Sequence, residues 1–404
     1  MSHRRPGPVP AFHVMAKPAG ARCNLACDYC FYRGKERLYP GGDLRMSEAT
    51  LEAYIRQAVE GQEAPEVTIT WQGGEPTLMG LDFFRRAVEV EAVLARPGRR
   101  IGNSFQTNGV LLDEEWCRFF RDHGFLVGLS LDGPRRLHDA YRHDKAGRSV
   151  FDRVELAARL MQARGVEFNI LCTVNAANAP HPLEVYRYFR DDLGARYVQL
   201  VPVVERADGA GGREGARPVT ERTVDPGLYG RFLIGVFDEW VRRDVGTVFV
   251  TFFDAVLASY LFGQSSLCVL RPACGDALVL EHNGDLYSCD HFVDPAHRLG
   301  NIAETPVAAL VASERQRAFG RAKSATLPRR CRGCRWLFTC HGECPKNRLL
   351  TTPDGEPGLN WLCAGLEAFF AHADRPMRIM ADLLRRGRPA AGVMDILSDG
   401  GPRG

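Results

Sequence analysis

The first half of the chain alternates between two hydrophobic patterns. Short apolar runs rich in Val, Ile and Phe indicate buried strands, and the segments between them repeat their apolar residues with helical spacing. In the first such segment, Leu51, Tyr54, Ile55 and Val59 form one apolar stripe, and Ser47 can cap the helix. The predicted strands are 11–17, 66–72, 101–107, 125–131, 166–174 and 197–204, and the predicted helices are 47–61, 81–95, 113–123, 149–164, 182–193 and 227–243.

This alternation of strands and helices with short links favours an α/β fold with a parallel sheet whose helices cover the outside. An open sheet, a full barrel and a partial barrel fit the pattern equally well. In each of them the ligand site lies beyond the carboxyl ends of the strands. Polar segments follow the first four predicted strands: the loop CNLACDYC, then WQGGEPT, QTNG and SLDGP. Together they predict one site, although any one of them alone would be a plain turn.

The composition is that of an ordinary globular protein, with 45% apolar and 25% charged residues. The length of 404 residues predicts two or more domains, and the small net charge of +3 gives no reason to expect nucleic acid or a membrane surface. We see no signal peptide and no apolar stretch near the roughly 18 residues of a membrane helix, so we expect a cytoplasmic protein. The glycine-rich segment 207–218 is expected to be a flexible loop or an insertion, and the tail 388–404 to be disordered.

The 13 cysteines dominate the candidate chemistry. In a reducing cytosol, clustered cysteines indicate metal sites rather than disulfides. Cys117 and Cys172 lie in apolar surroundings and are expected to be small buried core residues. The others are three near the start, Cys23, Cys27 and Cys30, with the spacing C-x3-C-x2-C, and eight further along, Cys268, Cys274, Cys289, Cys331, Cys334, Cys340, Cys344 and Cys363.

The eight downstream cysteines suffice for two complete four-thiolate sites, whereas the upstream three leave one ligand position open. Zinc is the simplest alternative, because C-x2-C pairs serve zinc ribbons as well as iron–sulfur clusters. The all-sulfur ligand set and the incomplete triad favour iron–sulfur clusters. His291 and His341 lie close to cysteines in the sequence, but we expect surface or hydrogen-bonding roles for them.

The C-x3-C-x2-C loop after the first strand, with GGEP after the second, resembles the radical S-adenosylmethionine (SAM) superfamily. The downstream cysteines resemble its SPASM type of auxiliary-cluster domain. CNLACDYCFY, TWQGGEPTL, QTNGVLL, GLSLDGP, YVQLVPVVER, LYSCDHF and LNWLCAGL are similar to segments of the anaerobic sulfatase-maturating enzymes. This resemblance implies a partial (β/α)6 barrel as the radical SAM core over 10–235, bridging helices over 236–265 and a SPASM domain over 266–375.

The resemblance also implies SAM and three [4Fe–4S] clusters as cofactors. Cys23, Cys27 and Cys30 would hold the cluster whose open iron binds SAM. Two auxiliary clusters would be held by Cys268, Cys274, Cys289 and Cys344, and by Cys331, Cys334, Cys340 and Cys363; spacing alone would equally allow the last five to pair differently. The implied SAM contacts are Tyr29, Gly73, Gly74, Glu75, Ser130, Arg142 and Val203. Their sequence surroundings alone would make Arg142 a solvated arginine and Val203 a core residue.

The implied reaction is oxidation of a cysteine or serine Cβ in a sulfatase peptide to Cα-formylglycine. The radical from SAM would abstract the Cβ hydrogen, Asp290 would take the thiol or hydroxyl proton, and an auxiliary cluster would accept the remaining electron. Without the resemblance, Asp290 would be expected to cap a turn. Gln72 and Tyr32 match family positions near the peptide. A flavodoxin or ferredoxin would be the low-potential electron donor.

Two other classes of protein fit the same residues. Another SPASM peptide maturase would form a thioether or carbon–carbon crosslink in a ribosomal peptide, and a non-enzymatic protein would bind zinc or carry electrons. The Asp–His–Phe run after Cys289 favours the sulfatase-maturating family over other maturases. Metal analysis of anaerobically purified protein separates the enzyme from a zinc protein.

Overall fold

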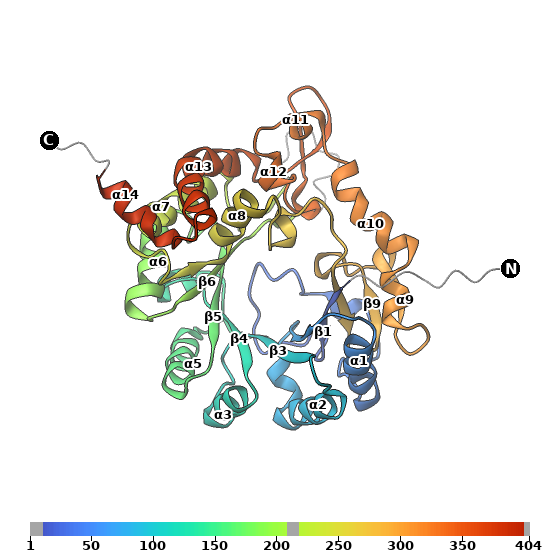
Figure 1. Ribbon diagram of the computed structural model, residues 1–404. Coiled ribbons are helices and arrows are strands. Elements are labelled where there is room, and N and C mark those ends of the chain that lie inside the picture. The colour runs from blue at the N-terminus through green and yellow to red at the C-terminus, as the bar shows by residue number, and fades with distance from the viewer. Residues whose placement is uncertain (1–10, 208–217, 400–404) are drawn as a thin grey trace. The chain divides into compact units, whose positions relative to one another are not determined.

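The computed structural model describes residues 11–207 and 218–399, which pack as two compact units (Figure 1). The first unit contains the described residues up to 129 together with 142–168 and 274–321, and the second contains the others. The predicted SPASM segment 266–375 therefore contributes to both units. Residues 208–217, the body of the predicted flexible loop, lie outside the described residues.

The first unit is built on a mainly parallel sheet with the strand order β10-β9-β8-β1-β2-β3-β4. Its parallel strands are β1 (His13–Lys17), β2 (Glu66–Trp71), β3 (Arg100–Thr107), β4 (Phe125–Ser130, whose last residue falls in the second unit) and β8 (Ala277–Glu281). The antiparallel strands β9 (Asp285–Tyr287) and β10 (Arg298–Asn301) extend it beyond β8. The pairing of β8 with β1 was not predicted, and it brings the Cys289 segment into the same unit as the first strand.

Helices cover one face of this sheet (Figure 1). They are α1 (Glu48–Glu60), α2 (Leu81–Leu94), α3 (Glu114–Asp122) and α5 (Phe151–Arg164), with the short α9 (Val307–Val311) further along. Helix α1 begins as predicted, because the Ser47 hydroxyl accepts a hydrogen bond from the Thr50 backbone N–H at 3.1 Å, and its predicted apolar stripe is buried. Every predicted strand is confirmed, with its ends shifted by no more than two residues.

A polar network lies within the helix–sheet layer of the first unit. The indole Nε1 of Trp71 donates to Asn103 Oδ1 at 2.9 Å, and Asn103 Nδ2 donates to Glu91 Oε2 at 2.7 Å. Burial raises the pKa of Glu91 to about 7, and the Asn103 hydrogen bond opposes this rise. Cys117 on α3 is fully buried, as predicted for a core residue.

The second unit contains the parallel strands β5 (Phe168–Val174, whose first residue falls in the first unit), β6 (Tyr197–Pro202) and β7 (Phe249–Val250). Its helices are α4 (Arg135–His138), α6 (Pro182–Arg187), α7 (Pro226–Arg243), α8 (Thr251–Phe262), α11 (Arg329–Arg332), α12 (Leu337–Cys340), α13 (Cys363–Arg385) and α14 (Val393–Asp399). Helix α10 (Glu314–Ala325) begins in the first unit and ends in the second. A short antiparallel pair is formed by β11 (Leu350–Thr351) and β12 (Pro357–Leu359). The predicted helix 182–193 is α-helical only to Arg187 and continues as a π-helix over Tyr188–Asp192.

Close packing of α7 on α13 depends on glycine. A Cβ on Gly365 would lie 2.0 Å from the Pro226 carbonyl oxygen, so a larger residue would force the two helices apart. Cys172 on β5 is fully buried, as predicted. No helix in the described part of the chain is both long and apolar enough to cross a membrane.

The prediction of a disordered tail over 388–404 is wrong for its described part. Residues 393–399 form α14, whose Val393 is fully buried, and α14 packs against α7. Val393 is buried and Met394 and Leu397 are half-buried, so this short segment has apolar surface to bury despite its flanking glycines. Residues 400–404 lie outside the described residues.

Candidate active site and cysteine pocket

The three-cysteine loop follows β1 directly and is anchored by the segment after residue 142. The Ala26 backbone N–H donates to the His143 carbonyl at 3.0 Å, and His143 Nε2 lies 3.2 Å from Asp28 Oδ1. Within the loop, the Cys30 N–H donates to the Cys27 carbonyl at 3.2 Å. These contacts hold the predicted ligands on one short turn of the first unit.

The thiols of this loop are poorly ionised without a cation. Burial raises the pKa of Cys23 to about 12, and burial also raises the pKa of Cys30, against which the positive charges of Arg142 and Lys17 act. A metal must therefore displace protons from these sulfurs when it binds. Among the described residues, no three His, Cys, Asp or Glu side chains are arranged to hold a single metal ion. Thiolates of a [4Fe–4S] cluster bind different irons, so an all-sulfur loop of this kind fits a cluster.

Two glycines after β2 let the backbone pass close to its neighbours. Gly73 and Gly74 have φ angles of +86° and +49°, a region that favours glycine. A Cβ on Gly74 would lie 2.0 Å from the Arg22 carbonyl oxygen, and a Cβ on Gly73 would lie 1.9 Å from Lys17 Cδ. Neither position accommodates a side chain without movement of its surroundings.

Glu75 is fully enclosed and its carboxylate is well supplied with donors. Oε1 accepts hydrogen bonds from the Thr77 N–H and hydroxyl and from the Thr107 hydroxyl, and Oε2 accepts one from the Asn108 N–H at 2.8 Å. Burial raises its pKa and these hydrogen bonds lower it. The carboxylate thus joins the end of β2 to the QTNG segment after β3.

Arg142 is buried, with 6% of its surface exposed, so it is not the solvated arginine that its sequence surroundings suggest. Its guanidinium carbon lies 5.5 Å from the centroid of the Tyr29 ring, which is itself buried. A guanidinium can bind a carboxylate in bidentate fashion, which is the chemistry that the predicted contact with the SAM carboxylate requires.

Four further side chains meet where β1 and β8 end. Lys17 Nζ lies 2.6 Å from Asp290 Oδ1 and 4.7 Å from the centroid of the Tyr32 ring. The Tyr32 hydroxyl donates to a carboxylate oxygen of Glu281, and Lys17 and Glu281 are direct neighbours in the β1–β8 register. Gln72, the residue after β2, contacts Met15 of β1 through its side-chain amide.

Sequence reasoning identified Tyr32, Gln72 and Asp290 but missed Lys17 and Glu281. The signal was present, because each is a charged residue that ends a buried apolar strand. His291 packs its ring against Phe31, with 5.1 Å between the centroids.

The other predicted site residues are divided between the units. Ser130 and Val203 belong to the second unit, where Val203 is buried and its N–H donates to the Val174 carbonyl at 2.8 Å. Of the predicted ligands of the first auxiliary cluster, Cys274 and Cys289 lie in the first unit and Cys268 and Cys344 in the second.

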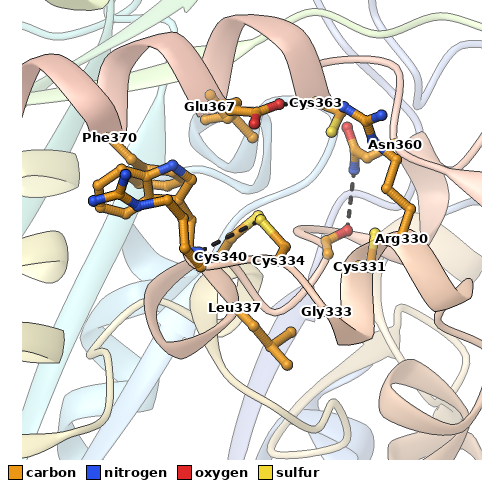
Figure 2. A pocket seen from close by; sticks show the side chains of 14 residues that line it. Arg330, Cys331, Gly333, Cys334, Leu337, Cys340, Asn360, Cys363, Glu367 and Phe370 are labelled. Atoms are coloured by element: carbon orange, nitrogen blue, oxygen red, sulfur yellow. Dashed lines mark hydrogen bonds and ion pairs between the residues drawn. The ribbon is translucent and has the colours of Figure 1, made fainter.

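The second unit contains a pocket of about 440 Å³ lined by cysteines (Figure 2). Its lining includes the four cysteines predicted for the second auxiliary cluster: Cys331, Cys334, Cys340 and Cys363. Cys331 lies in α11, Cys340 ends α12, and Cys363 begins α13, so three helices bring their sulfurs to one cavity. Apolar and aromatic side chains complete the wall, with Arg330 paired to Glu367 at 3.4 Å.

The chain turns sharply between Cys340 and Cys344. His341, Gly342 and Glu343 all have positive φ angles, of 47°, 72° and 51°. Cys344 is not among the residues that line the pocket. Burial raises the pKa of Cys340 to about 12 and that of Cys363 to about 11, so these thiols also require a metal to become thiolates.

Comparison with known proteins places this geometry in a family. Residues 18–182 match the radical SAM superfamily, and residues 268–335 match the iron–sulfur cluster-binding SPASM domain. These matches contain the three-cysteine loop and the downstream cysteines from Cys268 to Cys334.

Curated relatives match over almost the whole chain. A serine-type anaerobic sulfatase-maturating enzyme of Bacteroides thetaiotaomicron is 44% identical over 96% of this chain and 95% of its own length. A cysteine-type enzyme of Clostridium perfringens is 33% identical over 90% of this chain and 97% of its own. The solved structure described as native anSMEcpe with bound AdoMet and Cp18Cys peptide superposes with a TM-score of 0.82 at 32% identity, covering 93% of this chain and 100% of that one. The chain has the partial (β/α)6 barrel and SPASM domain of radical SAM enzymes, and it belongs to the anaerobic sulfatase-maturating enzymes.

Proposed function

We propose that this protein oxidises a serine or cysteine side chain in a sulfatase polypeptide to Cα-formylglycine. The observation that carries this proposal is Asp290, which follows Cys289 directly and lies against Lys17 at the end of β1, in the same unit as the three-cysteine loop. Its Oδ1 is buried against Lys17 and caps no turn, and 15% of the side chain remains exposed. A substrate hydroxyl or thiol can donate to the exposed part of this carboxylate.

The cofactors are SAM and three [4Fe–4S] clusters. Cys23, Cys27 and Cys30 hold the SAM-binding cluster. The first auxiliary cluster is held by Cys268, Cys274, Cys289 and Cys344, and the second by Cys331, Cys334, Cys340 and Cys363. The cysteine-lined pocket supports this crossed assignment, because its wall includes the second set and leaves out Cys344.

When bound, SAM and its cluster supply the radical that removes a hydrogen atom from the substrate Cβ. The residues of this chain bind and orient the reactants. Arg142 holds the SAM carboxylate, and Gly73 and Gly74 let the backbone approach its amino group. Glu75 supports this approach indirectly. Its carboxylate already accepts four hydrogen bonds, which fix the ends of β2 and β3.

Tyr29, through its backbone, and Val203 would line the adenine site of SAM, and Ser130 would hold its ribose. The Asp290 carboxylate takes the proton from the substrate, and Gln72 and Tyr32 bind the peptide beside it. The remaining electron would pass to an auxiliary cluster, and with a cysteine substrate water would hydrolyse the resulting thioaldehyde to the aldehyde. Tyr32 is well placed for a fixed role, because it is 4% exposed and its hydroxyl is held by Glu281.

Serine is the substrate residue that the relatives favour. Serine-type enzymes reach 44% and 39% identity with this chain, and the cysteine-type enzyme of Clostridium perfringens reaches 33%. A low-potential flavodoxin or ferredoxin supplies the electrons. The cytoplasm is the compartment that suits them, since a reducing environment keeps cysteines available as cluster ligands and does not favour disulfides. By cofactor, the chain divides into a SAM-binding core over 10–235, bridging helices over 236–265 and an auxiliary-cluster segment over 266–375.

The test is anaerobic incubation of the reconstituted enzyme with SAM, dithionite and one of two sulfatase-type peptides that differ only in serine or cysteine. Mass spectrometry should detect formylglycine with both peptides, and kcat/KM should be higher for serine. SAM cleavage with no formylglycine from either peptide would contradict the proposal, and a crosslinked peptide would identify a different maturase.

A further inference from the structure

Lys17 is a buried cation for which the proposed reaction has so far no role. It ends β1 with only 1% of its surface exposed. An ammonium group so far from water needs a counter-charge close by, and the carboxylate of Asp290 lies at 2.6 Å. The Tyr32 ring provides a second favourable contact at 4.7 Å, over its negative π face.

The fold brings these two charges together from distant parts of the sequence. In the parallel register of β1 and β8, Lys17 stands beside Glu281. The chain then turns through β9, which pairs antiparallel with β8, and returns to Asp290. Asp290 therefore reaches Lys17 only because β8 extends the N-terminal sheet.

The stem of Lys17 occupies the space that a side chain at residue 73 would need. A Cβ on Gly73 would lie 1.9 Å from Lys17 Cδ and 2.9 Å from Lys17 Cγ. The first glycine of the GGE segment thus leaves room for the lysine in addition to any role toward SAM. The backbone at Gly73 confines the Lys17 side chain, whose ammonium group lies against Asp290.

The ion pair with Lys17 uses only one of the two carboxylate oxygens of Asp290. Lys17 Nζ lies 2.6 Å from Oδ1, which is buried, while the Asp290 side chain keeps 15% of its surface exposed. The lysine therefore holds the carboxylate through Oδ1 and leaves its exposed part to the substrate. A hydrogen-bonded arginine fork in the same place would occupy both carboxylate oxygens.

We infer that Lys17 is a positioning residue that holds the Asp290 carboxylate toward the peptide substrate, an inference that rests on the proposed role of Asp290 as the proton acceptor. Lys17 does not contact the reacting atoms and acts through Asp290. Displacement of a reacting group by about 1 Å can lower the rate about 100-fold, so loss of the lysine should be costly.

The experiment compares the reconstituted holoenzyme with the variants Lys17→Met, Asp290→Asn, the double variant, and Lys35→Met as a matched control. Lys35 also reaches this segment and feels the charges of Asp294 and Asp290, but its ammonium donates to the Val293 carbonyl at 2.7 Å, whereas Lys17 is in direct contact with Asp290. Iron content, 5′-deoxyadenosine and formylglycine are measured on the same samples, together with the thermal midpoint of each protein.

Lys17→Met should lower formylglycine turnover about 100-fold, with iron content and SAM cleavage retained. In the Asp290→Asn background the same change should have less than about a twofold effect, because residues that act as one unit are not additive. Lys35→Met should stay within about twofold of wild type. The thermal midpoint should fall in Lys17→Met, which leaves a buried carboxylate unpaired, and should recover in the double variant.

Full turnover in Lys17→Met beside an inactive Asp290→Asn would overturn this inference and leave the proposed function intact. An equal loss from Lys17→Met in both backgrounds, or no recovery of the thermal midpoint, would likewise overturn it. If both Lys17→Met and Lys17→Gln lose iron while Asp290→Asn keeps it, Lys17 is a scaffold residue and the inference is wrong. An active Asp290→Asn variant would remove the proposed base and this inference with it.

Discussion

Under the proposed assignment, the three-cysteine loop and the four-cysteine pocket bind the same kind of cofactor in different surroundings. Around the loop lie charged and polar groups held in fixed positions: the buried Arg142, the enclosed Glu75 and the Lys17–Asp290 pair. The wall of the pocket is largely apolar, and its one ion pair joins Arg330 to Glu367. The loop supplies one thiolate fewer than a cluster can bind, whereas the pocket supplies a full set.

This difference separates two uses of one cofactor. A cluster that binds a reactant needs an open iron and neighbours that orient the reactant, and the loop offers both. A cluster that only carries electrons needs complete ligation and shielding from water, which four cysteines and an apolar wall provide. The most informative experiments alter residues in one region and measure the effects on both clusters.

The largest expected effect is the loss of the open site. Replacing Cys23, Cys27 and Cys30 together by Ala should abolish SAM cleavage and reduce the iron content by about one third, since one of three equal clusters is lost. The matched control replaces Cys331, Cys334 and Cys340 by Ala in the pocket. It should lose a similar share of iron but still cleave SAM. Cleavage that survives in the first variant would contradict the assignment of the radical site.

A smaller effect is expected at the guanidinium beside the loop. Arg142→Ala should weaken SAM binding by roughly 1.5–3 kcal/mol, the usual cost of a lost charge-assisted hydrogen bond. Equilibrium binding of SAM to the anaerobic protein measures this directly, and iron content should not change. Arg136→Ala is the control, because Arg136 is an exposed arginine paired with Glu184. Equal SAM affinity in both variants would contradict the role given to Arg142.

The smallest effect concerns the scaffold of the first unit. Burial raises the pKa of Glu91 from 4.5 to about 7, so folding favours its protonated form. The contribution of Glu91 to the free energy of unfolding is therefore complete below pH 4.5. It declines as the pH rises toward 7 and is lost above that pH. Glu91→Gln should raise the thermal midpoint at pH 8 and have little effect at pH 5, because the amide keeps the Asn103 contact without the buried charge. An increase of equal size at both pH values would show that the carboxylate charge is not the cause.

The sequence was sufficient for the alternating elements, because hydrophobic period is a local signal. The spacing of the cysteines marked them as ligands, but their division between two auxiliary clusters came from the resemblance. The sequence was not sufficient for the pairing of β8 with β1, which joins residues separated by most of the chain. Lys17 carries a local signal as a charged residue at the end of a strand, but its partner Asp290 is near only in the folded unit. Arg142 shows the same limit of sequence-based prediction, because its sequence neighbours are charged and polar although its side chain is buried in the fold. In the tail, the prediction of disorder followed the glycines around α14 and overlooked its apolar residues.

The central claim is that Asp290 takes the substrate proton, and the most direct measurement is formylglycine formed per SAM cleaved in Asp290→Asn. Asp294→Asn is its matched control, because Asp294 caps the next turn by accepting from the Ala296 and His297 N–H groups, a role that Asn fills well. We predict that Asp290→Asn keeps its clusters and SAM cleavage but loses formylglycine by roughly 100- to 10,000-fold, the usual contribution of a general base, while Asp294→Asn stays near wild type. A near-normal yield of formylglycine from Asp290→Asn would contradict the account.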